Sequence, residues 1–213
     1  MAVSGRTVIG IDVGGYRKGF HAVALHNGQF ETQHFAKVEG VSDWCRKQKA
    51  QAIAIDAPCA WSTEGRSRLV ERSLAIDGVT IQCFKTPTSV IAQGRAFYGW
   101  VFNGEQLYQS LLHYYTLFNG TTRTGKIVFE TFPHAVVCAL KGKVVPARPK
   151  ATTRRKVLRD EGYDDAPLRN IDYVDAALCA LTAERFLLSQ TISFGDQAEG
   201  FIVVPNKKQS KNK

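Results

Sequence analysis

The chain has 213 residues, of which 44% are hydrophobic and 22% are charged, and its formal net charge is +9. This length and composition are typical of one globular domain with a substantial core. No apolar run reaches the length of a membrane span and the five cysteines include no CxxC pair, which excludes a membrane-spanning chain and a cysteine zinc site. We therefore expect a soluble cytoplasmic protein with reduced thiols and no membrane partner.

Positive charge is concentrated in two stretches. Seven basic residues and no acidic one lie between Lys141 and Lys156, and the last nine residues, PNKKQSKNK, carry four lysines. Such patches favour a polyanionic partner through counterion release. The alternative for residues 206–213 is a disordered tail that only aids solubility. The predicted organisation is a single domain over residues 1–205 followed by this tail.

The first predicted strand, residues 7–13, carries a carboxylate in the apolar, β-branched run TVIGIDVGG. An aspartate in a strand buried on both faces needs a cation, a metal ion or several hydrogen-bond donors. This makes Asp12 a candidate site residue, although it could also simply begin the turn that the two glycines complete. The dipeptide Asn27-Gly28 predicts a hairpin, so residues 20–25 and 29–35 are expected to form two further antiparallel strands.

A second short strand also ends in a carboxylate. Ser42 is expected to begin a helix, and residues 52–56 form a buried strand that ends at Asp56. A strand reached through a helical crossover is most simply parallel to the first strand, and open α/β sheets bind ligands beyond the carboxyl ends of such strands. Asp12 and Asp56 are therefore predicted to face one site. The alternative for Asp56 is an Asx-type turn before Pro58.

Residues 60–103 are predicted to be an insertion or a lid. Within them, residues 69–76 have the pattern of a helix that carries basic side chains, and residues 84–87 resemble a loop. The stretch 94–102 interleaves Arg95 with four aromatic residues. Such a cluster can stack on nucleic-acid bases, but aromatic clusters more often belong to the core.

The next part of the chain offers a third acidic strand end. Residues 105–118 show apolar side chains at helical spacing, with Asn119-Gly120 as the stop. Residues 126–130 predict a short strand that ends in Glu130, and residues 131–140 predict a helix with proline in its first turn. The alternative role for this glutamate is an ion pair with an arginine.

Two more carboxylates come from a late helix. Residues 152–161 predict one helix and residues 170–188 a second, with Asn170 as the N-cap of the second. Asp172 and Asp175 are three residues apart and project from one face of this helix. Small residues continue that face, which lets the helix lie close to a sheet. An acid at position 172 also suits the helix dipole. Residues 200–205 are expected to form a short strand or a packed extension before the tail.

The acidic set predicts a metal centre. Clustered carboxylates without His or Cys are what hard Mg²⁺ or Mn²⁺ requires. Two such ions about 4 Å apart activate water and stabilise an in-line displacement at phosphorus, which together with a basic surface is typical of a nuclease. The catalytic candidates are Asp12, Asp56, Glu130, Asp172 and Asp175, and all except Glu130 are predicted metal ligands. The residues expected to contact nucleic acid are Arg17, Lys18, Arg66, Arg68, Arg148, Lys150, Arg154 and Arg155.

From about Thr7 to Phe186, the chain resembles the family catalogued as domain of unknown function 429, whose members are predicted ribonuclease H-like nucleases. The resemblance is carried by IGIDVGGYRKG, AIDAPCAW, GRSRLVER with FKTP after it, ETFPHAV and NIDYVDAALCALTAERF. It implies an α/β, ribonuclease H-like three-layer fold. In that fold a mixed five-stranded sheet, with the first three strands antiparallel and the rest parallel, is flanked by helices.

The segment DYVDAALCA is also similar to the last helix of Holliday-junction resolvases, whose D-x-x-D acids bind metal. This similarity implies metal roles for Asp172 and Asp175, as the wider resemblance does for Asp12 and Asp56. Glu130 matches the acid of the fifth strand in the family. Resolvases usually carry Glu where this chain has the shorter Asp56, and a junction-cutting activity would imply a homodimer.

Two other function classes stay open. One is a non-catalytic nucleic-acid or small-molecule binding protein on the same fold, because no residue by itself proves turnover. The other is an actin-like or sugar-kinase-type ATPase, whose first phosphate-binding loop also follows a strand with D-x-G-G. Such ATPases need two domains to enclose the nucleotide, which 213 residues hardly supply. The choice between DNA and RNA as substrate is also open.

Overall fold

The structure is a computed structural model that describes residues 5–207. Its chain begins, as predicted, with three antiparallel strands: β1 (Thr7–Val13), β2 (Phe20–His26) and β3 (Gln29–Phe35). Asn27 and Gly28 join β2 to β3 with φ values of 49° and 78°. Positive φ at both central residues of a two-residue turn matches the right-handed twist of the strands, so this dipeptide fixes the hairpin.

The remaining strands extend this sheet from β1. β4 (Ala52–Asp56) lies parallel to β1, β8 (Ile127–Glu130) parallel to β4, and β10 (Gly200–Pro205) parallel to β8, while β9 (Thr191–Asp196) closes the edge antiparallel to β10. The order is β3-β2-β1-β4-β8-β10-β9, with the short β7 (Thr116–Leu117) beside β8.

The expectation of a mixed α/β fold with a central sheet between helices is confirmed, but the sheet has eight strands within residues 5–207 rather than five. β7 has only two residues, and the half-buried side chains of β9 give a weak apolar pattern. Neither strand therefore carries a clear signal in the sequence. β10 was expected only as a short strand or packed extension, and it joins the sheet beside β8.

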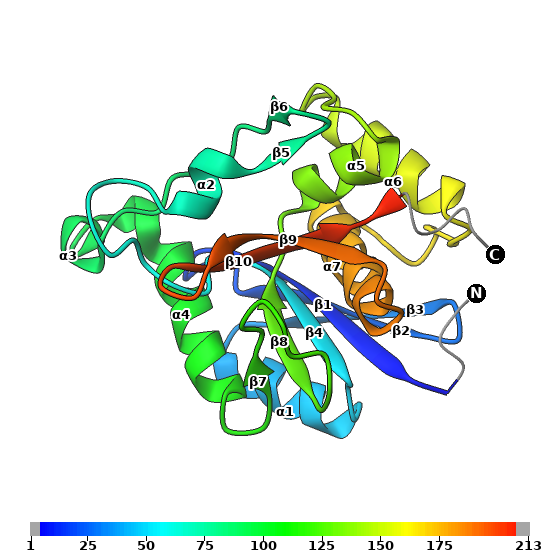
Figure 1. Cartoon of the computed structure of the whole chain (residues 1–213). Helices are drawn as coiled ribbons and strands as arrows, with labels where there is room; N and C mark the ends of the chain where they lie inside the picture. The colour runs from blue at the N-terminus through cyan, green and yellow to red at the C-terminus, as the bar shows by residue number, and fades with distance from the viewer. Residues whose placement is uncertain (1–4, 208–213) are drawn as a thin grey trace.

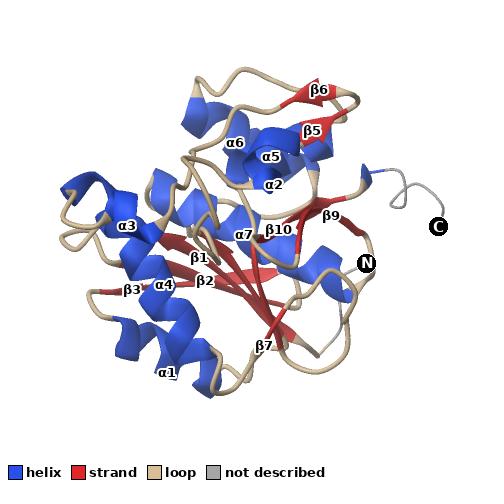
Figure 2. Ribbon diagram, turned by 60° about the vertical axis from the view of Figure 1, so that its left-hand side comes forward, coloured by secondary structure: helices blue, strands red, loops and turns tan. Residues whose placement is uncertain are grey.

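Helices cover both faces of the sheet (Figures 1 and 2). One face carries α5 (Pro133–Lys141), α6 (Lys150–Asp160) and α7 (Ile171–Leu187), and the other carries α1 (Val38–Lys47) and α4 (Gly99–Leu111). Because side chains alternate along a strand, each face has its own apolar cluster. Val8, Ala52 and Ala54 pack on the α7 face, whereas Ile9 and Ile53 pack on the α1 and α4 face.

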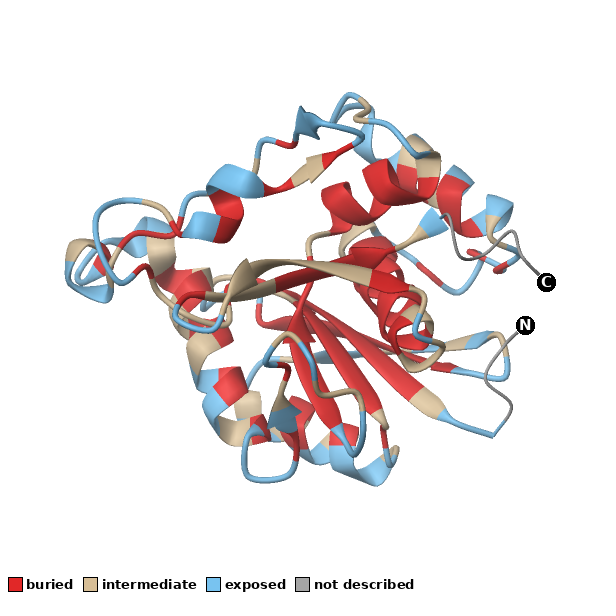
Figure 3. Cartoon of the chain, in the orientation of Figure 1, coloured by how far each residue is buried: buried red, intermediate tan, exposed pale blue. Residues whose placement is uncertain are grey.

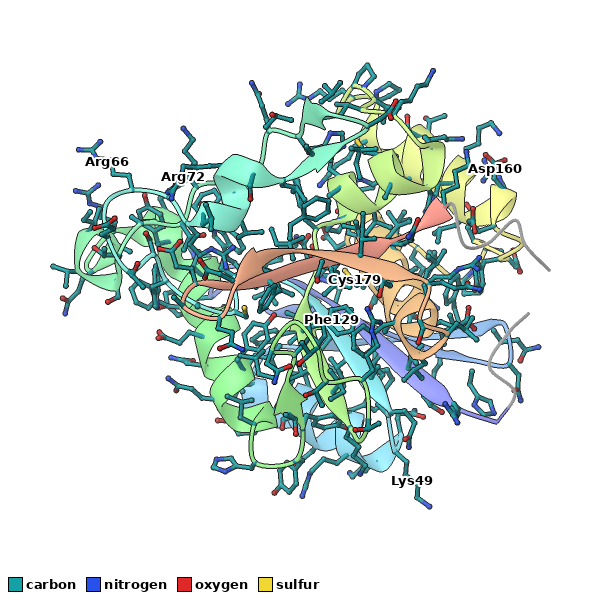
Figure 4. The ribbon with its side chains drawn as sticks, viewed as in Figure 1. Lys49, Arg66, Arg72, Phe129, Asp160 and Cys179 are labelled. Carbon is teal, nitrogen blue, oxygen red and sulfur yellow. The ribbon has the colours of Figure 1, made fainter. Side chains whose placement is uncertain are left out.

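The helix α7 lies unusually close to β1. A Cβ placed on Gly10 would lie 1.9 Å from the carbonyl oxygen of Ala176 and 2.2 Å from the backbone nitrogen of Ala180. Only glycine therefore fits at this point of β1, and small residues on α7 meet it from the other side. Figure 4 shows Phe129 and Cys179 in the interior, where the sheet and α7 meet. The expected small face of the late helix is confirmed.

The predicted insertion lies between β4 and α4, outside the large sheet. It contains α2 (Leu69–Ser73), the two-stranded hairpin of β5 (Ala75–Ile76) and β6 (Val79–Thr80), α3 (Ser89–Ala92) and a 3-10 turn (Ala96–Tyr98). Figure 3 shows that much of this segment is exposed, and Arg66 and Arg72 extend outward from it in Figure 4. The helix predicted over 69–76 ends early because Asp77 and Gly78, at φ values of 51° and 76°, form a hairpin turn.

The helix predicted over 105–118 is displaced towards the N-terminus. α4 begins at Gly99 and ends at Leu111, and the buried Tyr115 and Phe118 follow it in a turn and near β7. The apolar spacing continues past the helix because Tyr115 packs in the same cluster as α4, whereas Phe118 packs in the cluster on the α7 face. None of the helices in residues 5–207 is both long and apolar enough to cross a membrane. The predicted tail lies almost entirely outside the described residues.

Candidate metal centre

Asp12 and Asp56 lie side by side at the carboxyl ends of β1 and β4. The parallel register pairs Asp12 directly with Asp56, and both side chains fall on the α7 face by the alternation of each strand. Asp175, near the start of α7, completes the group: one oxygen from each of the three carboxylates lies within 4.8 Å of the other two. The structure thus brings together three of the predicted metal ligands.

Asp12 is 7% exposed and has one cationic partner among residues 5–207. The ammonium of Lys18, in the turn after β1, lies 3.1 Å from Asp12 Oδ2. Burial, together with repulsion from Asp175 and Asp172, raises the pKa of Asp12 to about 6 although Lys18 acts in the opposite direction. The buried carboxylate is therefore under-compensated by the protein alone.

Asp56 differs because no side-chain cation and no hydrogen-bond donor in residues 5–207 contacts it. Burial and the charges of Asp12 and Asp175 raise its pKa well above the usual range, and the more distant Arg154 and Lys150 only partly oppose this. A carboxylate that lacks a partner and lies beside two further carboxylates is strongly stabilised by a bound cation. Asp56 therefore has the surroundings of a cation-binding residue.

Asp175 is 1% exposed and paired with two basic residues of α6. Arg154 donates a hydrogen bond to Asp175 Oδ1, and the ammonium of Lys150 lies 3.1 Å from Oδ2. Both basic residues were predicted to contact nucleic acid. Arg154 is buried and paired with Asp175, so the expectation that it lies on a nucleic-acid surface is wrong. Lys150 is exposed, as expected. The sequence of α6 contains few apolar residues, so its pattern does not indicate which face, and hence which basic residue, packs against α7.

Asp172 lies one turn before Asp175 and outside the group of three. Its Oδ1 is 2.7 Å from the ammonium of Lys18, which thereby bridges Asp172 and Asp12. A second group with ligand atoms within 4.8 Å of one another consists of Asp12, Asp172 and His21. His21 was not predicted, although the hairpin between β1 and β2 pairs it with Asp12 and could have indicated it.

Glu130 does not join the other carboxylates. It accepts hydrogen bonds of 2.8 and 2.6 Å from the guanidinium of Arg68, and one of 2.8 Å from the backbone nitrogen of Cys59. The register of β8 against β4 explains its position, because Glu130 pairs with Ile55 and not with Asp56. Successive side chains of a strand point to opposite faces, so Glu130 lies on the face opposite to that of Asp56. The alternative interpretation, an ion pair with an arginine, describes this residue.

The remaining predicted basic residues fall into two classes. Arg68 is 1% exposed and held by Glu130 and Glu71, so it is an interior residue and not part of a nucleic-acid surface. Arg155 is half-buried and donates to Asp165 and to the carbonyl of Leu168. The exposed members of the set are Arg17, Arg66, Arg148 and Lys150, together with the partly exposed Lys18.

A small cavity of about 60 Å³ adjoins Asp56. Aromatic side chains including Trp100 and Phe132 line it, together with Thr86, whose buried hydroxyl has no hydrogen-bond partner within the described part of the chain. The volume suits a few water molecules. Asp56 and the ion pair of Glu130 with Arg68 therefore line the same cavity.

A comparison with known families gives one match over most of the chain. The model described as "Protein of unknown function (DUF429)" matches residues 10–200, which include all of the acidic residues discussed above. A search of curated proteins found no similar sequence.

Proposed function

The chain belongs to the DUF429 family of proteins of unknown function, and we propose that it is a metal-dependent nuclease that hydrolyses phosphodiester bonds. The observation that carries this proposal is the convergence of Asp12, Asp56 and Asp175 at the carboxyl edge of the sheet, with ligand oxygens within 4.8 Å of one another. Three acids brought this close repel one another unless a cation is shared between them.

The chemistry of these donors fits Mg²⁺ or Mn²⁺. All three are carboxylate oxygens, the ligands that hard divalent ions prefer, and Asp56 has no other cationic partner among the described residues. When bound, such an ion supplies a Lewis acid that polarises a phosphoryl oxygen and lowers the pKa of water. Asp12, Asp56 and Asp175 would hold it.

The chain's own residues have separate tasks in this proposal. Arg154 and Lys150, both on α6, hold the carboxylate of Asp175 in place. Two exposed cations lie close in the sequence to basic residues that contact the acids: Arg17 directly precedes Lys18, and Arg148 lies two residues before Lys150. These side chains would bind backbone phosphates of a nucleic acid and position them near the acids.

We also propose that the fold is ribonuclease H-like. Three antiparallel strands followed by the parallel β4 and β8, with a helical layer on each face, support this assignment. Basic residues already contact three of the four carboxylates without an ion, because Lys18 contacts Asp12 and Asp172 while Lys150 contacts Asp175. That observation favours the second candidate, a non-catalytic nucleic-acid binding protein on the same fold.

The two candidates are separated by a cleavage assay. Purified protein is incubated with single-stranded, duplex, hybrid and branched nucleic acids in Mn²⁺, in Mg²⁺ and in chelator. We expect cleavage only with a divalent ion. Asp12→Asn, Asp56→Asn and Asp175→Asn are each expected to reduce the rate by at least about 100-fold, because changes in the surroundings of a metal ligand already cost 10- to 100-fold.

The matched control is Asp43→Asn, which removes a carboxylate from the exposed surface of α1 and should leave the rate unchanged. Binding without cleavage of any of these substrates would support the non-catalytic candidate. Cleavage that is insensitive to all three site substitutions would reject the proposed centre.

A further inference from the structure

Lys18 occupies the space between two carboxylates at the site. Its ammonium lies 3.1 Å from Asp12 Oδ2 and 2.7 Å from Asp172 Oδ1. Asp12 belongs both to the group with Asp56 and Asp175 and to the group with His21 and Asp172. The ammonium therefore contacts two of the three residues of the second group, at the place where that group could hold an ion.

The lysine is built into this position. Its backbone nitrogen donates to the carbonyl of Gly15 at 2.9 Å, and its own carbonyl is 2.8 Å from Nε2 of His34. The aliphatic stem lies across Gly14: a Cβ there would be 2.5 Å from Lys18 Cβ and 2.6 Å from its Cγ and Cδ. A side chain at residue 14 would push the lysine away, so the glycine is what lets the ammonium reach Asp12.

The local charges limit how many ions fit beside the lysine. Four carboxylates meet here, and three basic side chains contact them: Lys18, Lys150 and Arg154. With all four carboxylates ionised, this leaves one formal negative charge when no ion is bound. One divalent ion gives the site a net positive charge. A second ion would raise that charge and would be repelled by the ammonium of Lys18.

We propose that the ammonium of Lys18 takes the place of a second divalent ion. The chain then binds a single ion, at Asp12, Asp56 and Asp175, instead of the pair of ions expected from the sequence. This inference rests on the metal centre of the proposed function. Without the ammonium, the second position offers Asp12, Asp172 and His21. Because imidazole is a ligand there, that position takes an ion that accepts nitrogen as well as oxygen, such as Mn²⁺ or Zn²⁺.

The test counts bound Mn²⁺ by native mass spectrometry and calorimetric titration, with no nucleic acid present. We expect one ion per wild-type chain and two per chain in Lys18→Gln. The double variant Lys18→Gln with His21→Gln should return to one ion, because the second position loses its nitrogen ligand. Lys47→Gln, an exposed lysine on α1, is the matched control and should bind one ion.

A second pair of variants leaves the lysine itself in place. Gly14→Ala should displace the stem of Lys18 and admit a second Mn²⁺. Gly15→Ala has open space at its Cβ and should bind one ion like the wild type. This pair also serves if Lys18→Gln fails to fold, which circular dichroism would reveal.

Each outcome bears on the inference separately from nuclease activity. Two ions in the wild type, or a single ion in both Lys18→Gln and Gly14→Ala, would overturn it. No ion in the wild type would overturn it as well, together with the metal centre. One ion in the wild type and two in the variants, with no cleavage of any substrate, would support the inference while rejecting the nuclease.

Discussion

The three carboxylates of the candidate centre differ in how the protein compensates their charge. Asp175 has two basic partners and Asp12 has one, whereas Asp56 has none among the described residues. Burial of an acid without a partner opposes folding, because the charged form is favoured by water in the unfolded chain. At the scale of single residues, Asp56 is therefore the group that most strongly favours binding of a cation.

Asp56→Asn is expected to stabilise the protein in the presence of chelator. The folded-state pKa of Asp56 is raised, so the ionised group destabilises the fold at neutral pH and the amide removes that cost. The melting temperature should rise by at least about 2 °C, the shift that 1 kcal/mol produces in a chain of this size. Thermal unfolding measured by circular dichroism provides the check.

The contrasting variant is Asp175→Asn, which leaves Arg154 buried without its carboxylate and should lower the melting temperature. Equal shifts of the melting temperature in both variants would show that the charges of Asp56 and Asp175 are compensated equally, which would contradict the contacts described above.

At this scale the sequence predicts part of the site. Asp12, Asp56 and Asp175 each lie at a strand end or on the small face of a helix, the pattern that predicts them, and the structure brings them together. Glu130 came from the same pattern, yet a shift of one residue in register places it with Arg68. Register and the pairing of buried cations depend on contacts between distant segments, which a single sequence does not state.

Among the elements, α7 and β1 form the contact that sets the site. Backbone meets backbone at Gly10, where Ala176 and Ala180 approach more closely than any side chain would permit. Because Asp12 is two residues beyond Gly10 on the same face of β1, and Asp175 immediately precedes Ala176, this one contact places both acids. The backbone packing of α7 on β1 thus determines the spacing of Asp12 and Asp175, and side-chain rotamers have a smaller effect.

Gly10→Ala is expected to destabilise the protein by about 3 kcal/mol, the upper end of what overpacking usually costs. The added methyl group has no space, since the nearest obstacles are backbone atoms of α7 that cannot rotate away. Urea unfolding monitored by fluorescence gives the free energy of unfolding. Gly15→Ala, with nothing near its Cβ, is the control for adding a methyl group and should change it little.

The segment between β4 and α4 is held to the sheet by a carboxylate in the turn from β9 to β10. Glu199 accepts hydrogen bonds from the backbone of Thr63 and Leu69 and from the hydroxyl of Ser62. Burial of Glu199 opposes its ionisation, but these donors outweigh it and lower the pKa from 4.5 to about 2. The charged form is thus preferred in the folded protein.

This preference predicts a pH dependence. A depressed pKa contributes stability that is fully present above pH 4.5 and is lost as the pH falls towards 2. Glu199→Gln should therefore be less stable than wild type at pH 7, and the difference should shrink between pH 4.5 and 2. Urea unfolding over this range measures it. The exposed Glu64→Gln should match wild type throughout, and a constant difference for Glu199→Gln would refute the assignment.

The elements could be predicted where local patterns decide them. The first three strands and the late helix follow from the Asn27-Gly28 turn and the Asn170 cap, whose side chain accepts from the backbone nitrogens of Asp172 and Tyr173. α4 was displaced in the prediction because Tyr115 and Phe118 continue the apolar spacing from outside the helix. Periodicity reports which side chains are buried and not which element carries them.

Across the whole molecule, the basic residues divide into buried ones that are paired with acids and exposed ones. Some cations are internal partners of acids, as Arg68 and Arg154 are, whereas Arg17, Arg66 and Arg148 are exposed. Only the exposed group can meet a polyanion without breaking an interior contact. The net charge of +9 therefore overstates the charge available to a nucleic-acid partner.

A bound ion should stabilise the entire chain. At a Mn²⁺ concentration about 100 times its dissociation constant, binding to the folded state alone contributes about 2.7 kcal/mol. For a chain of this size that is a rise in melting temperature of about 5–10 °C. Differential scanning calorimetry with and without Mn²⁺ measures it. Chelator should reverse the rise, and Asp175→Asn should abolish it; an equal rise in that variant would place the ion elsewhere.

The glycine at position 10 has a consequence for how this protein tolerates change. Main-chain atoms meet there, so the closest approach of β1 to α7, and with it the spacing of Asp12 from Asp175, is set by backbone rather than by core side chains. Redesign of the apolar interior should then alter how firmly the chain folds while preserving the spacing of its acids. Volume-conserving exchanges in the core should therefore keep the acids in place as long as Gly10 and the length of α7 before Ala176 are kept.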